Sequence, residues 1–143
     1  MSFYTDVKDF HRAFGQPVGE KPELPNDGRN FNDKERMLRR KLLLEEMNEY
    51  MEAEKGNDLV EIADALADII YIACGTAVSY GIPLDKVYAE VHRSNMAKLV
   101  DGKPLYREDG KVMKPEGWTP PDVEGVLKKS HDEYICKIAQ ITL

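Results

Sequence analysis

Apolar residues recur at helical spacing over most of the chain, and this pattern predicts an all-α fold. A first amphipathic helix is expected over residues 2–14, before Gly15, and the proline-rich residues 16–32 predict a loop. Three longer helices are expected over residues 33–55, 58–80 and 83–98, with Asn32 or Asp33 capping the first of them. Short links between long helices favour an antiparallel helical bundle. Because three amphipathic helices rarely close a core alone, we expect two chains to associate.

The helix expected over residues 33–55 changes character along one face. Leu38, Leu42, Glu45 and Glu49 follow one another at helical spacing, so this stripe begins apolar and ends acidic. Glu46 lies beside the acidic end. The residues expected to flank the stripe toward the core are Leu43, Leu44, Met47, Tyr50 and Met51.

The next helix begins with an acidic segment, residues 58–68, that runs directly into an apolar one. Glu61, Asp64 and Asp68 lie along one side of it, and the chain has no lysine or arginine between Gly56 and Asp85. An exposed helix face normally alternates signs or pairs Glu with Lys four residues on. Unpaired carboxylates at the edge of a core are costly, and a bound cation is the usual remedy.

Two acidic stripes on helices joined by a short link predict a metal site. If the helices pack antiparallel, the acidic end of the first meets the acidic start of the second. Clustered carboxylates suit Mg²⁺, with Mn²⁺ as a substitute. The six candidate ligands are Glu45, Glu46, Glu49, Glu61, Asp64 and Asp68. Each stripe taken singly could also be a solvated helix face. The absence of basic partners in the second stripe favours the metal site instead.

Beyond residue 98 the helical pattern stops. The segment 102–115 predicts two short extended strands around Asp109-Gly110, a hairpin signal. A last short helix is expected over residues 122–130, while the final residues alternate weakly and predict no element.

Several residues outside the acidic stripes are candidates for substrate binding. Arg93, Asn95 and Lys98 end a helix next to a hairpin that carries Lys111 and Lys114, and they would neutralise phosphate and contact a nucleoside; helix C-termini also favour cations for structural reasons. Arg39 lies near the face of Glu46 and would reach phosphate, or else be an ordinary surface residue. His11 would stack on a base or pack in the core. Trp118 would be a lid or a packing anchor.

Composition narrows the class of protein. The chain has 143 residues and a net charge of −6. We expect one domain, made of an N-terminal helix and loop (1–32), core helices (33–98) and a hairpin with a C-terminal arm (99–143). The acidic charge argues against a nucleic-acid partner. Two distant cysteines, no signal peptide and no obvious membrane span favour a cytoplasmic protein.

The motifs resemble those of the MazG-like all-α nucleoside triphosphate pyrophosphohydrolases, whose signature is EExxE followed by ExxD. Glu45-Glu46-x-x-Glu49 matches the first half and Glu61-x-x-Asp64 the second. The segments EVHRSNMAK and GKVMKPEGW resemble the subgroup that is similar to phosphoribosyl-ATP pyrophosphohydrolase. In relatives the ExxD aspartate often precedes two apolar residues and a tyrosine. In that register Asp68 is the ligand and Ala65 replaces the glutamate, so the ligands among the second set stay open.

The resemblance implies Mg²⁺-dependent hydrolysis of a nucleoside triphosphate to monophosphate and pyrophosphate by a homodimer or a dimer of dimers. In this hypothesis Glu45, Glu49, Asp64 and Asp68 hold metal, and Glu46 orients or deprotonates the attacking water. dUTP or a non-standard nucleotide is a plausible substrate by resemblance alone. Two alternatives remain: a phosphoribosyl-ATP pyrophosphohydrolase, and an inert helical dimer that serves as a binding module.

Overall fold

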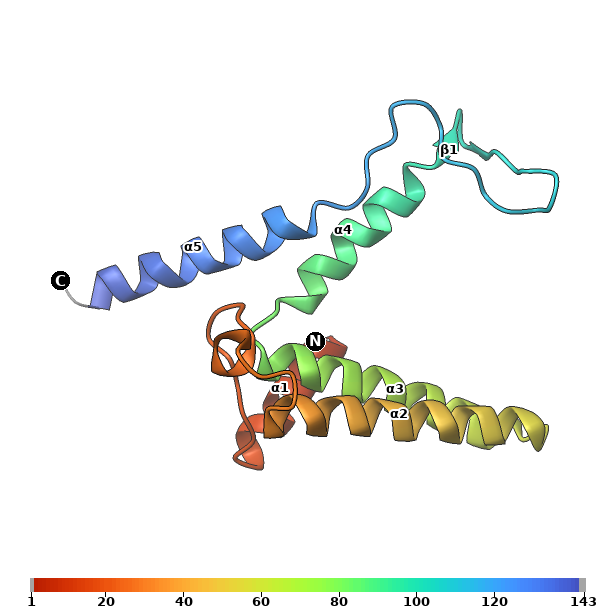
Figure 1. Ribbon diagram of the computed structural model, residues 1–143. Coiled ribbons are helices and arrows are strands. Elements are labelled where there is room, and N and C mark those ends of the chain that lie inside the picture. The colour runs from red at the N-terminus through yellow and green to blue at the C-terminus, as the bar shows by residue number, and fades with distance from the viewer. Residues whose placement is uncertain (1, 142–143) are drawn as a thin grey trace. The chain divides into compact units, whose positions relative to one another are not determined.

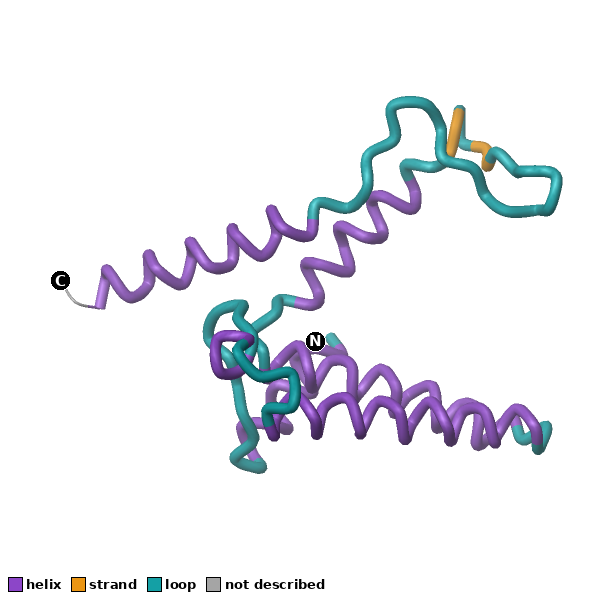
Figure 2. Tube along the Cα trace, in the orientation of Figure 1, coloured by secondary structure: helices purple, strands orange, loops and turns teal. Residues whose placement is uncertain are grey.

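The computed structural model describes residues 2–141, and five α-helices account for most of that range (Figures 1 and 2). The all-α class expected from the sequence is confirmed. The helices are α1 (Phe3–Ala13), α2 (Lys34–Lys55), α3 (Leu59–Ser79), α4 (Leu84–Met96) and α5 (Val123–Ile141). A single 3₁₀ turn, η1 (Pro25–Gly28), interrupts the predicted loop, and two short strands, β1 (Leu99–Val100) and β2 (Lys103–Pro104), follow α4.

The chain forms two compact units, Met1–Leu84 and Asp85–Leu143. The first unit holds α1, α2 and α3, and the second holds nearly all of α4 together with the strands and α5. Each unit is described by itself. The expected single domain stays a prediction.

Within the first unit, α2 and α3 pack side by side as an antiparallel pair (Figure 1). Aspartate caps begin both helices: Asp33 accepts hydrogen bonds from the backbone N–H groups of Glu35 and Arg36, and Asp58 accepts them from Val60 and Glu61. The tight link between the helices requires Asn57 to adopt a left-handed conformation, with φ of 51°. The short link places the end of α2 opposite the start of α3.

The core of this unit lies where α1 packs on α3. Val7, Cys74 and Val78 are buried there. The loop after α1 is fixed to the end of α3, because the Gly19 N–H donates to the Val78 carbonyl oxygen and the Glu23 N–H donates to the Tyr80 carbonyl oxygen. This anchoring sets where α2 begins.

The expected apolar flank of α2 is only partly covered, because Leu43 and Tyr50 are half-buried and the other three residues are exposed. Leu44, Met47 and Met51 are exposed, while Arg39 and Ala53 are the buried residues of α2. The face that packs on α3 therefore follows Arg39, Glu46 and Ala53 rather than the apolar flank. This corrects the expectation, which assumed that the most apolar face of the helix faces inward.

Helix α3 meets the length and composition criteria for a membrane span, which differs from the expectation that no such stretch exists. Core helices of globular proteins meet the same criteria. The first half of α3 carries Glu61, Asp64 and Asp68, and carboxylates at membrane depth are costly. We interpret α3 as a packing helix of the first unit.

The second unit continues from α4 into two consecutive turns. Strands β1 and β2 pair antiparallel around Asp101-Gly102, where both residues have positive φ. The predicted hairpin around Asp109-Gly110 is present as a single antiparallel bridge between Tyr106 and Val112. Helix α5 corrects the expectation of a short helix over residues 122–130, because it continues to Ile141. The weak alternation after residue 130 concealed a helical spacing of Leu127, Tyr134 and Ile138.

Candidate metal centre

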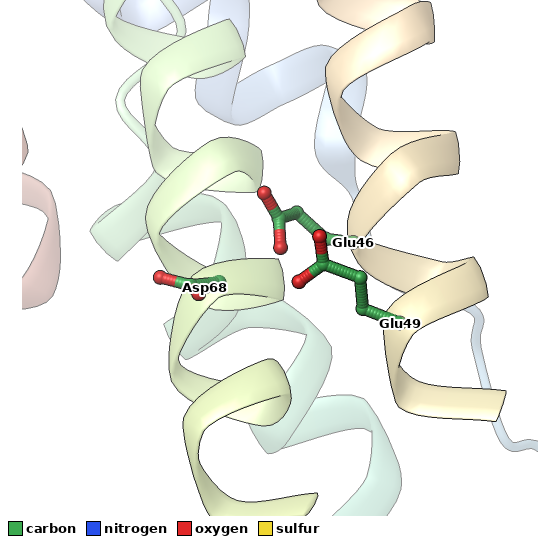
Figure 3. Close-up of side chains that lie close together, drawn as sticks. All are labelled: Glu46, Glu49 and Asp68. Atoms are coloured by element: carbon green, nitrogen blue, oxygen red, sulfur yellow. The ribbon is translucent and has the colours of Figure 1, made fainter. Parts of the chain in front are cut away.

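Three of the predicted carboxylates meet between α2 and α3. Glu46 and Glu49 extend from α2 toward α3, which carries Asp68 (Figure 3). Each residue offers one oxygen atom, and these three oxygen atoms lie within 4.8 Å of one another. We call these residues the carboxylate cluster. A separation of this size suits a shared hard cation with oxygen ligands.

Glu46 is the most constrained member of the carboxylate cluster. Its Oε2 atom is fully covered and has no hydrogen-bond partner in residues 2–141. Burial raises the pKa of the Glu46 carboxyl, and the neighbouring charges of Glu49 and Asp68 raise it further. Because a covered carboxylate oxygen without a partner is costly, the donor set fits a cation that would satisfy that oxygen.

A groove of about 650 Å³ continues from the carboxylate cluster along the two helices. Glu49 belongs to both the cluster and the groove wall. The predicted ligands Glu61 and Asp64 line the groove, and so do Asn48, Glu52 and Asp58, which were not among the predicted ligands. Asp58 also caps α3. The groove is therefore acidic along its length.

Glu45 lies outside the carboxylate cluster. Its side chain is exposed, and its Oε1 atom lies 3.9 Å from Nζ of Lys41, one turn earlier on α2. Among the residues of the second helix, Asp68 rather than Asp64 joins Glu46 and Glu49. This geometry favours the register in which Asp68 stands before two apolar residues and Tyr71.

Arg39 and His11 are both buried, so His11 packs in the core, one of its two expected positions, and Arg39 is not the surface residue offered as its alternative. The Arg39 guanidinium donates to Thr76 Oγ1 at 3.0 Å and to the Ile72 carbonyl oxygen at 2.8 Å. His11 Nδ1 lies 2.8 Å from the Pro17 carbonyl oxygen. Only 6% of Arg39 and 2% of His11 is exposed. Both side chains are committed to internal contacts that join the elements of the first unit.

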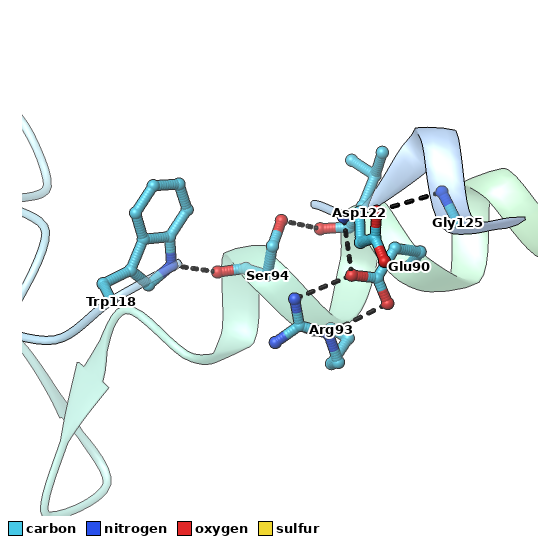
Figure 4. Close-up of polar contacts among 7 residues, drawn as sticks. Glu90, Arg93, Ser94, Trp118, Asp122 and Gly125 are labelled. Atoms are coloured by element: carbon cyan, nitrogen blue, oxygen red, sulfur yellow. Dashed lines mark hydrogen bonds and ion pairs between the residues drawn. The ribbon is translucent and has the colours of Figure 1, made fainter. Parts of the chain in front are cut away.

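In the second unit, four predicted substrate-binding residues gather at the end of α4. Lys98 Nζ and Lys114 Nζ lie 5.5 and 4.8 Å from the centroid of the Trp118 ring. Lys98 also donates to Asn95 Oδ1 at 2.9 Å. Trp118 itself is anchored, because its indole N–H donates to the Ser94 carbonyl oxygen at 2.6 Å (Figure 4). Two ammonium groups against one aromatic ring make a polar, cationic surface.

Arg93 and Lys111 do not join that group through any contact found in residues 2–141. Arg93 forms a two-pronged ion pair with Glu90 at 2.7 and 2.9 Å. Glu90 also accepts from the Asp122 N–H, and these contacts lower the pKa of its carboxyl to about 2 (Figure 4). The Lys111 N–H caps the turn by donating to Asp109. Arg93 thus has a structural partner in this arrangement.

Sequence reasoning missed the two residues that hold the C-terminal segment on α4. Ser94 is buried, and its carbonyl oxygen accepts a hydrogen bond from the Trp118 indole N–H. The Glu90 carboxylate accepts a hydrogen bond from the Asp122 backbone N–H. Ser94 and Glu90 lie four residues apart on one helix face. That spacing is visible in the sequence, but nothing in it indicates which segment binds there.

Comparison with known proteins places this architecture in a family. The profile of the phosphoribosyl-ATP pyrophosphohydrolase family matches residues 7–95, a range that includes the carboxylate cluster. The protein is therefore of the MazG-like all-α class. The chain belongs to the phosphoribosyl-ATP pyrophosphohydrolase family.

A curated relative is also similar over most of the chain. The uncharacterized protein L479 of Acanthamoeba polyphaga mimivirus is 30% identical over 137 residues, which cover 93% of this chain and 51% of the relative. The chain spans about half the length of that relative.

Proposed function

We propose that this protein hydrolyses a nucleoside triphosphate to the monophosphate and pyrophosphate, with Mg²⁺ as the cofactor. The observation that carries the proposal is the carboxylate cluster, in which Glu46 Oε2 is covered and unpaired. A cation there would compensate three negative charges and attract a phosphate chain into an otherwise repulsive groove.

Phosphoribosyl-ATP is a second candidate substrate. The matching family profile favours it. The chemistry is the same for both substrates, because water attacks the α-phosphorus and the bond to the bridging oxygen of pyrophosphate breaks. The two proposals differ only in what the site contacts beyond the phosphates.

The residues of the carboxylate cluster have distinct proposed roles. Glu49 and Asp68 would hold the metal together with one oxygen of Glu46, and Asp64 and Glu61 would hold a further ion along the groove. Bound Mg²⁺ would neutralise phosphate charge and increase the acidity of water. Glu46 would also orient the attacking water and take its proton.

Residues of the second unit are proposed to contact the rest of the substrate. Lys98 and Lys114 would offset phosphate charge, Asn95 would bond to the nucleoside, and Trp118 would offer a stacking surface. Lys111 and Arg93 would assist by their charge; Arg93 would first have to exchange its ion pair with Glu90. A cytoplasmic location and a homodimer complete the proposal.

The test is a substrate panel. Purified protein with Mg²⁺ or Mn²⁺ is offered each NTP and dNTP, dUTP and phosphoribosyl-ATP, and products are resolved by ion-exchange chromatography. Monophosphate with pyrophosphate from one or a few substrates is the expected result. No turnover with either metal, together with no metal-induced thermal stabilisation, would instead indicate an inert binding module.

A further inference from the structure

A small pocket lies where α1 packs on α3 in the first unit. Its volume is about 220 Å³, and the buried residue Val7 forms part of its wall. We call it the α1–α3 pocket; the residues that line it are Phe3, Asp6, Val7, Ala67, Ile70 and Tyr71. All of them except Asp6 are apolar or aromatic. Apolar walls with a single polar group are the usual composition of a site for a small organic ligand.

The aromatic wall of the α1–α3 pocket is held in place from α1. The Phe10 ring meets the Tyr71 ring edge-on, with the centroids 5.6 Å apart and the planes at 83°. Phe10 is itself stacked on Phe14, at a centroid distance of 4.3 Å. Tyr71 nevertheless stays exposed, and so do Phe3 and Ile70. These surfaces would leave water if a flat apolar ring entered the pocket, which is favourable.

Asp6 gives the α1–α3 pocket its polarity. Among the lining residues in the described range 2–141, it alone carries a charge, and its carboxylate has no hydrogen-bond or ion-pair partner in that range. The ion pair on α1 is instead between Asp9 and Arg12. An ionised carboxylate only accepts hydrogen bonds and repels other anions. The pocket therefore suits a ring with N–H groups at its edge and does not suit a phosphate group.

The α1–α3 pocket and the carboxylate cluster share one turn of α3. Ala67 directly precedes Asp68, and Tyr71 follows Asp68 by three residues, or about 4.5 Å along the helix axis. Neighbouring positions on a helix differ in direction by about 100°. For this reason Ala67 lies against the pocket beside α1, while Asp68 joins Glu46 and Glu49 of α2. A ligand whose charged end reaches the cluster thus has an apolar pocket close by.

We propose that the α1–α3 pocket receives the base of the nucleotide substrate and that Asp6 selects bases with an exocyclic amino group. This inference rests on the proposed function. Cytosine, adenine and guanine present amino N–H groups that donate to a carboxylate. Uracil and thymine have no amino group, and their carbonyl oxygens would face the oxygens of Asp6. Asp6 is therefore a specificity-determining residue, and dUTP is a poor substrate.

Binding of free nucleosides tests the pocket without hydrolysis. In saturation-transfer NMR without metal, deoxycytidine, deoxyadenosine and deoxyguanosine should bind at least about tenfold more tightly than deoxyuridine and thymidine. That ratio is the effect expected of one hydrogen bond to a charged group. Equal binding of all five nucleosides, or no binding of any, would overturn the proposal.

Ala67→Leu blocks the pocket in the same experiment. Ala67 is exposed, so the larger side chain enters the pocket without disturbing the core, and the circular dichroism spectrum should not change. Binding of every nucleoside should fall at least about tenfold. Nucleosides that bind Ala67→Leu as tightly as the wild-type protein must occupy another place, which would reject the α1–α3 pocket.

Asp6→Asn tests the selection of the base. Asparagine has a similar shape but offers N–H donors as well as an acceptor, so it can also bond to a uracil carbonyl. The ratio of kcat/KM for dCTP to that for dUTP should fall at least about tenfold, mainly through KM. The matched control is Asp9→Asn, on the same helix but outside the pocket, and it should keep the wild-type ratio. An unchanged ratio in Asp6→Asn would remove Asp6 from base selection.

The binding and kinetic results separate this inference from the proposed function. If nucleosides bind with the expected preference and no triphosphate is hydrolysed, the proposed function fails and the base pocket stands. If triphosphates are hydrolysed with equal kcat/KM for bases with and without an amino group, the proposed function stands and the inference about Asp6 fails.

Discussion

Glu46 and Asp68 face one another across the antiparallel pair α2 and α3, seven residues beyond the point where Arg39 meets Gly75. Seven residues forward on α2 correspond to seven residues back on α3, so both contacts belong to one register. At the first contact, the Arg39 guanidinium fills the space that a side chain at Gly75 would occupy. At the second contact, the carboxylates of Glu46 and Asp68 meet. The contact between Arg39 and Gly75 fixes the register of α2 against α3, and this register determines which acidic residues can share a cation.

This register predicts that Asp68 matters more for metal binding than Asp64. Asp68→Asn should remove most of the thermal stabilisation by Mn²⁺, because it removes a charge from the carboxylate cluster. Asp64→Asn should remove less, because Asp64 lines only the groove. Thermal unfolding with and without Mn²⁺ measures both. Equal losses would mean that the metal lies farther along the groove.

Glu46→Gln should lower kcat by about 10²–10⁴-fold, the usual contribution of a general base. Without metal, the same variant should unfold at a slightly higher temperature than the wild-type protein, since it removes one of three mutually repelling carboxylates. Single-turnover kinetics and a thermal scan give the two results. Full activity in Glu46→Gln would remove Glu46 from the proposed chemistry.

The sequence predicted the helices of the first unit well because local rules set them. Asp33 and Asp58 cap α2 and α3 where a capping residue precedes a periodic segment, and the carboxylates share a groove because the link is short. The sequence prediction placed Glu45 on the metal-holding stripe and Glu46 beside it, whereas in the structure Glu46 joins the carboxylate cluster and Glu45 lies outside it. Neighbours on one helix are rotated by about 100°, so only the register with α3 decides which of them faces the partner helix.

Core packing of His11 was one of the two positions expected from the sequence, but the inward position of Arg39, and the partners of both side chains, were not predicted. Charged and polar side chains are rarely buried unless partners are available. Those partners, Thr76 and the carbonyl oxygens of Ile72 and Pro17, come from segments distant in sequence. The opposite error occurred at Leu44, Met47 and Met51, where apolar character suggested burial and the structure shows exposure.

Gly75→Ala should destabilise the protein by about 1–3 kcal/mol, the usual cost of overpacking a well-packed interior. A Cβ at position 75 would overlap the Arg39 guanidinium and approach His11 Nε2 at 3.2 Å. The guanidinium is held by two hydrogen bonds and cannot easily move. Urea denaturation measures the change.

Gly56→Ala is the matched control for Gly75→Ala. A Cβ there meets only the Glu52 and Ala53 carbonyl oxygens, at 3.5 and 3.7 Å, which is ordinary contact. Its φ of −80° suits alanine. The control should change stability little; a Gly75→Ala variant as stable as this control would contradict the close packing of Arg39.

Glu90 joins the C-terminal segment to α4, because it accepts a hydrogen bond from the Asp122 N–H while it is paired with Arg93. We expect this attachment to be sensitive to acid. The pKa of Glu90 is lowered from 4.5 to about 2, chiefly by the hydrogen bonds from Arg93 and then by the Asp122 N–H. A lowered folded-state pKa means that the ionised carboxyl stabilises the attachment above about pH 4.5 and loses this effect as pH falls toward 2. Trp118, the only tryptophan in the sequence, reports the attachment by fluorescence, because its indole N–H is bound to Ser94.

Comparison with Glu90→Gln isolates this effect from general acid unfolding. The variant keeps the size of the side chain but has no charge to lose, so its Trp118 should be less well anchored than that of the wild-type protein at neutral pH. Between pH 5 and pH 2 the fluorescence difference between the two proteins should shrink as Glu90 becomes protonated. A difference that stays constant over this range would show that the charge of Glu90 does not hold the segment.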